Sequence, residues 1–163
     1  CTWVDANEVA VSADKVIQPL EVAVRAIRRI HAGEALALSY VALDVPTHRR
    51  QQTLALMFFR CSCRRCQDPK EYGSGISAIK CSCGGFVTPV VPDSDASDDD
   101  WVCDRCGQHR TWASVKREDD LLWDKVIDAR RRNSRADLEA LLANALTHLH
   151  DGHYLRYACH KHV

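Results

Sequence analysis

Hydrophobic and polar residues alternate differently in the two halves of the chain, and the first part has the pattern of β-strands. Residues 21–30, EVAVRAIRRI, alternate loosely, and residues 35–40, ALALSY, place every second residue on one face. Between them, Gly33 supplies the turn chemistry of a short connection. We therefore predict an antiparallel pair of strands over residues 21–40.

A helix is predicted next, over residues 47–59, THRRQQTLALMFF, with Thr47 as its N-cap. We expect Arg49 and Arg50 to be solvated residues of this helix. Further on, residues 90–100, VVPDSDASDDD, are acidic, contain proline and have no aromatic side chain, so we expect a mobile loop there.

The last third of the chain has the periodicity of amphipathic helices. Residues 114–133 carry apolar side chains at helical spacing, and residues 134–150 carry a stronger stripe. Ser134, with Asp137 three residues later, resembles a capping box at the start of the second helix. Two adjacent helices of this kind cannot bury their stripes alone, so we expect them to begin a longer helical array. The stripe consists of Leu138, Leu141, Leu142, Ala145, Leu146 and Leu149.

Composition narrows the class of protein. Lys plus Arg equal Asp plus Glu, 22 against 22, so no net charge favours nucleic acid or a membrane surface. No apolar run approaches the roughly 18 residues of a membrane span. The start of the chain, CTWVDANEV, has neither an initiator methionine nor the build of a signal peptide. We therefore expect a soluble globular fragment with no direct contact to nucleic acid or membrane.

Nine cysteines in 163 residues are the strongest chemical signal. Seven of them stand one or two residues apart in C-x-C and C-x-x-C pairs, which suit a metal better than disulfide geometry. Disulfides and a thioredoxin-like redox pair are the weaker alternatives. We predict zinc. The seven form a first cluster, Cys61, Cys63 and Cys66, and a ribbon cluster, Cys81, Cys83, Cys103 and Cys106.

The ribbon cluster resembles the paired knuckles of a zinc ribbon, in which glycines after the thiols let backbone amides approach sulfur. Gly84, Gly85 and Gly107 stand at such positions. Four thiols complete a closed tetrahedral site. His109 is an alternative ligand by residue type.

The first cluster has three thiols, whereas a closed structural zinc site has four ligands. His48 is a candidate for the fourth by residue type, and Cys1 and Cys159 are the unassigned cysteines. Either cysteine would bring a distant part of the chain onto residues 61–66. Spacing alone does not choose among these candidates.

Two segments, in order, resemble the end of a SET domain and its cysteine-rich post-SET segment. They are VAVRAIRRIHAGEALALSY, residues 22–40, and THRRQQTLALMFFRCSCRRCQDP, residues 47–69. The chain looks like the SET-and-MYND family of protein-lysine methyltransferases, particularly its insect-type members. The family's W-x-C-x-x-C also appears, as Trp101, Cys103 and Cys106. The last helices resemble the start of the family's C-terminal helical domain.

The resemblance implies a role for three residues. By position, Cys1 matches the family cysteine that gives the fourth zinc ligand to C-x-C-x-x-C. Tyr40 matches the catalytic tyrosine, which orients the transferred methyl group and sits close to the sulfonium of S-adenosylmethionine. Phe59 matches the aromatic residue that stacks on the adenine of this cofactor. Methyl transfer to a lysine amine needs in-line alignment and a neutral amine, which a dry channel favours.

We therefore expect an α+β fold: the C-terminal part of a β-rich SET fold with zinc-binding segments, followed by antiparallel helices. The expected regions are 1–58 (end of the SET domain), 59–70 (post-SET zinc segment), 71–110 (zinc-ribbon-like module) and 111–163 (start of the helical domain). The expected activity is S-adenosylmethionine-dependent methylation of a protein lysine, histone or non-histone, with two zinc ions. The chain alone is expected to be inactive, monomeric, and located in the cytoplasm or nucleus.

Two departures from the family pattern favour an alternative hypothesis for the function. Thr2, Trp3 and Val4 follow Cys1 where the family continues x-P-N, and Met57 stands where related enzymes often have a tyrosine that lines the lysine channel. The rival is a catalytically dead, zinc-stabilised scaffold for protein–protein interaction. A nucleic-acid-binding zinc ribbon is a further alternative, which the neutral charge disfavours.

Overall fold

The computed structural model describes residues 25–26, 29–90 and 101–163. The chain separates into two compact units, Cys1–Tyr40 and Val41–Val163. Cys1, most of the predicted strand 21–30 and nearly all of the acidic insert lie outside the described residues. The predicted boundaries of the four regions stay a prediction.

In the first unit the predicted turn is present, but the described residues after it form no strand. The amide of Glu34 donates to the carbonyl of His31 at 3.1 Å, and Gly33 has a φ of +80° that suits glycine. Residues 35–40 are irregular, so the strand predicted there is wrong. Alternation shows which face an element would bury, whereas a strand also needs a neighbour for its backbone groups.

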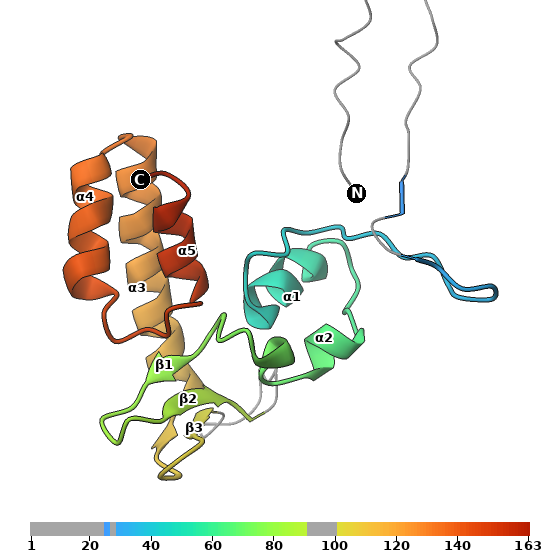
Figure 1. Cartoon of the computed structure of the whole chain (residues 1–163), viewed down its shortest axis with the longest axis horizontal. Helices are drawn as coiled ribbons and strands as arrows, with labels where there is room; N and C mark the ends of the chain where they lie inside the picture. Colours follow the sequence, from blue (N-terminus) through green and yellow to red (C-terminus); the bar gives the residue numbers. More distant parts are fainter. Residues whose placement is uncertain (1–24, 27–28, 91–100) are drawn as a thin grey trace, which may run out of the picture. The chain divides into compact units, whose positions relative to one another are not determined.

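The second unit has the predicted α+β architecture (Figure 1). Two short helices and a 3₁₀ turn come first: α1 (Thr47–Ala55), α2 (Arg64–Gln67) and η2 (Glu71–Gly73). A four-stranded antiparallel sheet follows in the order β1-β2-β3-β4. Its strands are β1 (Ile79–Lys80), β2 (Phe86–Pro89), β3 (Trp101–Cys103) and β4 (His109–Arg110).

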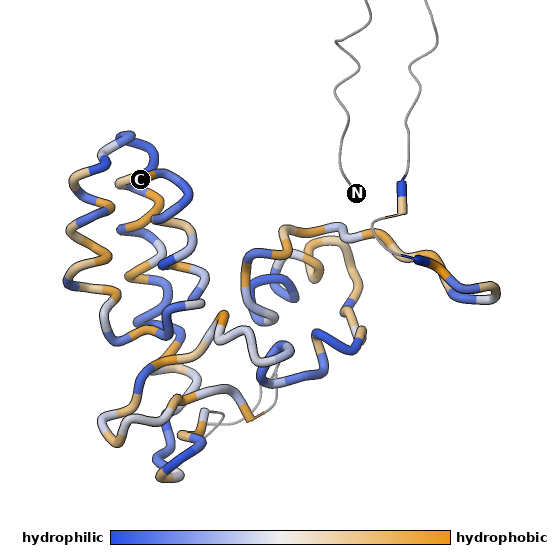
Figure 2. The backbone as a smooth tube through the Cα atoms, in the orientation of Figure 1, coloured by the Kyte–Doolittle hydropathy of each residue, from blue (hydrophilic) through white to orange (hydrophobic). Residues whose placement is uncertain are grey.

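The chain ends in a helical bundle of α3 (Trp112–Arg131), α4 (Arg135–Ala140), η3 (Leu141–Ala145) and α5 (Tyr154–His160). Helices α3, α4 and α5 lie side by side, and hydrophobic and hydrophilic residues alternate along them (Figures 1 and 2). Among the helices described, none is both long and apolar enough to cross a membrane.

The predicted helical stripes form the core of this bundle. Val115, Leu122, Val126 and Ala129 of α3 are buried, as are Leu138, Leu146 and Leu149. The hydroxyl of Ser134 accepts from the amide of Asp137 at 3.3 Å, which confirms Ser134 as the N-cap of α4. The second predicted helix is shorter than expected, because η3 is a π-helical turn that sequence periodicity does not signal.

The sheet and the bundle share one core. Val87, Trp101 and Cys103 belong to the same buried cluster as the bundle residues. The rings of Trp101 and Trp112 are nearly parallel, with an angle of 6° and centroids 6.3 Å apart. Residues 148–150 also run along the outer edge of β1, where Lys80 donates its amide to His148 at 2.7 Å. The sheet is therefore anchored to the bundle by both side chains and backbone.

Helix α1 differs from the prediction at both ends. It ends at Ala55 instead of residue 59, and Thr47 is its first residue instead of its N-cap. The amide of Thr47 donates to the carboxylate of Glu71 at 2.6 Å, so a side chain 24 residues away satisfies the helix start. Periodicity and local capping rules cannot foresee a partner that arrives through tertiary folding.

The two arginines of α1 are not solvated as expected. Arg49 lies against α3, where its Nε and Nη2 donate to Oδ2 of Asp119 at 3.0 and 2.6 Å. The hydroxyl of Tyr154 donates to Oδ1 of the same carboxylate at 2.7 Å, and the Arg49 guanidinium stands 5.1 Å from the ring centroid of Trp123. Asp119 therefore joins α1, α3 and α5.

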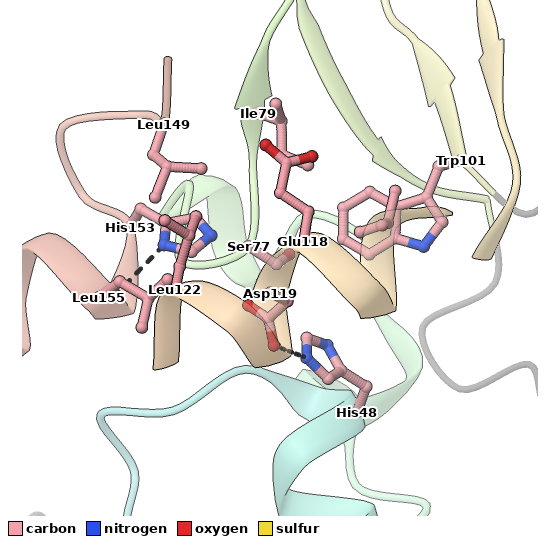
Figure 3. A pocket seen from close by; sticks show the side chains of 11 residues that line it. His48, Ser77, Ile79, Trp101, Glu118, Asp119, Leu122, Leu149, His153 and Leu155 are labelled. Carbon is pink, nitrogen blue, oxygen red and sulfur yellow. Dashed lines mark hydrogen bonds and ion pairs between the residues drawn. The ribbon is translucent and has the colours of Figure 1, made fainter. Parts of the chain in front are cut away.

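Figure 3 shows His48 and Asp119 at a small cavity with room for about one water molecule. Nε2 of His48 lies 3.4 Å from Oδ2 of Asp119. Burial alone would raise the pKa of Asp119, but the hydrogen bond from His48 and the charge of Arg49 outweigh it and lower the pKa to about 2. A lowered carboxylate pKa stabilises the fold above about pH 4, and this contribution is lost as the pH falls through about 2.

We predict that Asp119→Asn lowers the free energy of unfolding at pH 7 by about 3 kcal/mol, because the half-buried Arg49 then keeps only the more exposed Asp120 as a charged partner. Urea unfolding followed by circular dichroism measures the change. The matched control is Asp128→Asn on the same helix. The carboxylate of Asp128 pairs with Arg132, and both side chains are exposed to solvent. That variant should lose less than about 1 kcal/mol, and equal losses in the two variants would contradict the anchoring role.

Candidate metal centres

The ribbon cluster brings four thiols together at one end of the sheet, from the turn between β1 and β2 and the turn between β3 and β4. Cys81 follows β1 and Cys103 ends β3. The sulfur of Cys81 lies 3.7 Å from that of Cys106, the sulfur of Cys83 lies 3.5 Å from that of Cys103, and all four lie within 4.8 Å of one another. Sulfurs bound to tetrahedral zinc at about 2.3 Å stand roughly 3.8 Å apart, whereas bonded sulfurs stand at about 2.05 Å. The geometry therefore fits a metal site of free thiols.

The backbone around the ribbon cluster is shaped for thiolates. The amide of Gly85 donates to the sulfur of Cys83 at 3.4 Å, and that of Arg105 to the sulfur of Cys103 at 3.5 Å. A Cβ at Gly85 would lie 2.9 Å from the Cys103 sulfur, so glycine permits this close approach. The backbone amides of Cys106 and Arg105 lower the pKa of Cys103, which favours the thiolate at this one sulfur, whereas the pKa of Cys106 is raised.

The first cluster gathers its three thiols around α2. Cys63 precedes this helix, Cys66 lies within it, and the three sulfurs of Cys61, Cys63 and Cys66 are within 4.8 Å of one another. Two thiols are exposed or half-buried, while Cys66 is buried. The chemistry of this donor set suits zinc, with three of the four positions supplied by the described residues.

The structure separates the candidates for the fourth ligand. Cys159 is fully buried in the core of the bundle, and His48 faces Asp119 and packs edge-on against Trp112. Neither gathers with the first cluster. Cys1 lies outside the described residues, so its assignment as a ligand stays a prediction that comes from the family resemblance.

Tyr40 and Phe59 belong to different units of the chain. Tyr40 is 66% exposed, and Phe59 is 41% exposed in the irregular segment after α1. Met57 is 47% exposed in the same segment. The cavity in Figure 3 includes none of these residues, and the predicted roles of Tyr40 and Phe59 stay predictions.

Three residues around the first cluster were missed by sequence reasoning: Arg50, Gln51 and Glu71. All three are buried, and each hydrogen-bonds across the chain near the cysteines. Polar residues in a short helix and a loop have the same sequence pattern whether they are solvated or buried. The signal available was their proximity in sequence to C-x-C-x-x-C, and it does not specify contacts.

Comparison with known proteins supports the resemblance drawn from the motifs. No family model matches the chain. The chain is 38% identical over 89 residues to SET domain-containing protein SmydA-8, isoform B, of Drosophila melanogaster, which is 52% of this chain and 19% of that protein. The chain thus spans about a fifth of the length of this relative. Together with the gathered cysteine sulfurs, the similarity confirms the resemblance to SMYD-type SET-domain proteins.

We predict two zinc ions per chain, because the two clusters lie in separate loops and each has a thiolate donor set. Metal analysis after gel filtration should give two zinc ions for the wild type and one for Cys103→Ser. Chelation should unfold the sheet, because structural zinc sites contribute on the order of 10 kcal/mol. Cys159→Ala, which removes a buried thiol outside both clusters, is the control and should retain both ions. A wild-type chain without zinc would contradict the assignment.

Proposed function

We propose that the chain forms part of an S-adenosylmethionine-dependent protein-lysine methyltransferase that acts on a histone or non-histone lysine. The observation that carries the proposal is the 38% identity to a SET-domain protein. The order of motifs supports it: G-E-A-L-A-L-S-Y up to Tyr40, then Phe59, then the first cluster. The chain contributes the end of the SET region, two zinc centres and the first helices of a helical domain.

In this proposal Tyr40 and Phe59 face the cofactor. S-adenosylmethionine supplies the methyl group when it is bound. The phenol of Tyr40 orients the methyl group and stays close to the sulfonium without competing as a nucleophile. The ring of Phe59 stacks on the adenine, and the substrate lysine loses its proton more easily in a desolvated channel.

The local structure around Phe59 supports a stacking role. The amide of Phe59 donates to the carbonyl of Leu54 at 3.4 Å, at the end of α1. Two residues later, the backbone of Cys61 is held by Gln51 on both its amide and its carbonyl. The backbone of the segment that carries the ring is therefore tied to α1 at both ends, which supports a fixed backbone position for Phe59.

The remaining parts of the proposal concern the partners and the place of action. We propose that the partner is a protein that presents a lysine, and that nucleic acid and membranes are not bound directly. The balanced charge of 22 basic and 22 acidic residues supports this. We also propose a monomer in the cytoplasm or nucleus, where free thiols and zinc persist in a reducing environment.

A catalytically dead scaffold is the second candidate function. Met57 favours it, because a thioether cannot replace the hydroxyl of a channel tyrosine. The departure Thr2-Trp3-Val4 after Cys1 also favours it, because it alters the segment next to the cofactor in the family pattern. Such a scaffold keeps its zinc and does not need the cofactor.

We predict that the longer protein that contains this chain transfers labelled methyl groups to protein lysines and binds S-adenosylmethionine in a calorimeter. Tyr40→Phe should lower the transfer rate by about 100-fold while cofactor binding persists, because the change removes one group that acts on the transition state. Tyr72→Phe, an exposed tyrosine in η2, is the control and should leave the rate unchanged.

The same measurements separate the candidate functions. The chain of 163 residues alone should transfer no methyl groups, and robust transfer by it would contradict the proposal. Absence of both cofactor binding and transfer in the longer protein, with zinc retained, would favour the scaffold.

A further inference from the structure

We propose that helix α1 pre-assembles the first cluster for its metal, with Gln51 and Arg50 as positioning residues for Cys61 and Cys66. The inference rests on the proposed zinc at this cluster and deepens it. Gln51 and Arg50 are adjacent in sequence and are 7% and 2% exposed. Such burial of two polar side chains needs fixed partners, and the cysteine loop supplies them.

Gln51 holds Cys61 by two hydrogen bonds. Its Nε2 donates to the carbonyl of Cys61 at 2.7 Å, and its Oε1 accepts from the amide of Cys61 at 3.0 Å. A side-chain amide that pairs with both backbone groups of one residue fixes the orientation of that residue. The direction of the Cα–Cβ bond of Cys61 is thus set before a metal binds.

Arg50 is fixed by four contacts, one of which reaches the cluster. Its Nη1 donates to the carbonyl of Val45 at 2.6 Å and to Glu71 at 2.8 Å, and its Nη2 donates to the hydroxyl of Thr47 at 2.6 Å. The same Nη2 lies 3.5 Å from the sulfur of Cys66. A guanidinium held this firmly presents its charge to one sulfur at a constant distance.

The local charges are arranged to favour a metal-bound trithiolate. Arg65 also donates to Glu71, with Nε 2.9 Å from Oε2, so two guanidiniums share one carboxylate. One positive charge is left over beside Cys66. Three thiolates around a divalent cation carry one excess negative charge. The surplus positive charge offsets it at the buried Cys66, where charges interact more strongly than at the more exposed thiols.

The ribbon cluster provides a comparison within the same molecule. Its sulfurs accept from the backbone amides of Gly85 and Arg105, and its contacts include no buried arginine comparable to Arg50 among the residues described. Loss of Arg50 or Gln51 should therefore weaken metal binding at the first cluster and leave the ribbon cluster unchanged.

Zinc affinity of the full chain is measured at both clusters by competition with a chromophoric chelator, and the ligand field of each is followed by Co²⁺ absorption. Arg50→Met should weaken zinc binding at the first cluster by about 10- to 100-fold, and Gln51→Met by about 10-fold, as for other outer-sphere partners of metal ligands. Both should shift the Co²⁺ spectrum of this cluster alone. Arg50→Lys should bind zinc at this cluster more tightly than Arg50→Met and less tightly than the wild type, because lysine keeps the positive charge but lacks the two donor arms of the guanidinium.

Glu71→Gln distinguishes a positioning role from a purely structural one. Glutamine keeps one acceptor oxygen, which in place of Oε2 still accepts from Arg50 and Arg65, whereas its NH2 group in place of Oε1 no longer accepts from the amide of Thr47. The change also removes the negative charge that competes for the guanidiniums. Zinc affinity at the first cluster should stay equal or rise in this variant. A loss in Glu71→Gln as large as in Arg50→Met would overturn the inference, as would an unchanged affinity in Arg50→Met and Gln51→Met.

Failure of the underlying zinc assignment gives a different result. In that case the wild-type chain binds one zinc ion, at the ribbon cluster, and Co²⁺ gives no thiolate spectrum from the first cluster. If Arg50→Met unfolds and loses both metals, the other two variants test the inference. Gln51→Met leaves the Arg50–Glu71 pair intact, and Arg50→Lys keeps the positive charge beside Glu71.

Discussion

The second unit depends on buried charge pairing that starts from one short helix. Helix α1 places Arg49 against Asp119 of the bundle and, one residue later, Arg50 against Glu71 beside the first cluster. Adjacent residues of a helix point about 100° apart, so the two guanidiniums reach in different directions from one backbone. The arrangement holds the cysteine loop and the bundle to the same element. A helix of this length has little stability of its own, and tertiary contacts of this kind have to supply it.

The two zinc-type clusters are supported in different ways. The ribbon cluster is built from strand ends and glycine turns, and backbone amides serve its sulfurs. The first cluster is built from a loop and a four-residue helix, and side chains from α1 serve it. Backbone support is local and follows from the knuckle itself, whereas side-chain support joins the metal to the segment that carries Phe59. A methyltransferase function would use this second connection, because the cofactor site and the metal would then share one rigid backbone.

Sequence patterns predicted the parts of the structure that depend on local or periodic signals. The stripe of α3, the Ser134 cap and the glycines of the ribbon were all foreseen, because period, capping and close backbone approach are properties of neighbouring residues. The pairing of Arg49 with Asp119, the burial of Arg50 and the capping of α1 by Glu71 were not, because each depends on a partner that tertiary folding supplies. The strand predicted at 35–40 is wrong, because alternation indicates a face that could be buried and does not by itself set the backbone conformation.

The bridge between Ile79 and Leu149 has a consequence for how the chain is made. The outer edge of β1 is covered by a segment that a ribosome adds about 70 residues later. Until then, the nascent sheet presents unpaired amides and carbonyls that can pair with another chain. Early zinc binding at the ribbon cluster would hold the β1–β2 and β3–β4 turns together while the outer edge of β1 is still unpaired. The last third of the sequence therefore packs against the sheet as a helical bundle and also covers the edge of β1 that could otherwise pair with another chain.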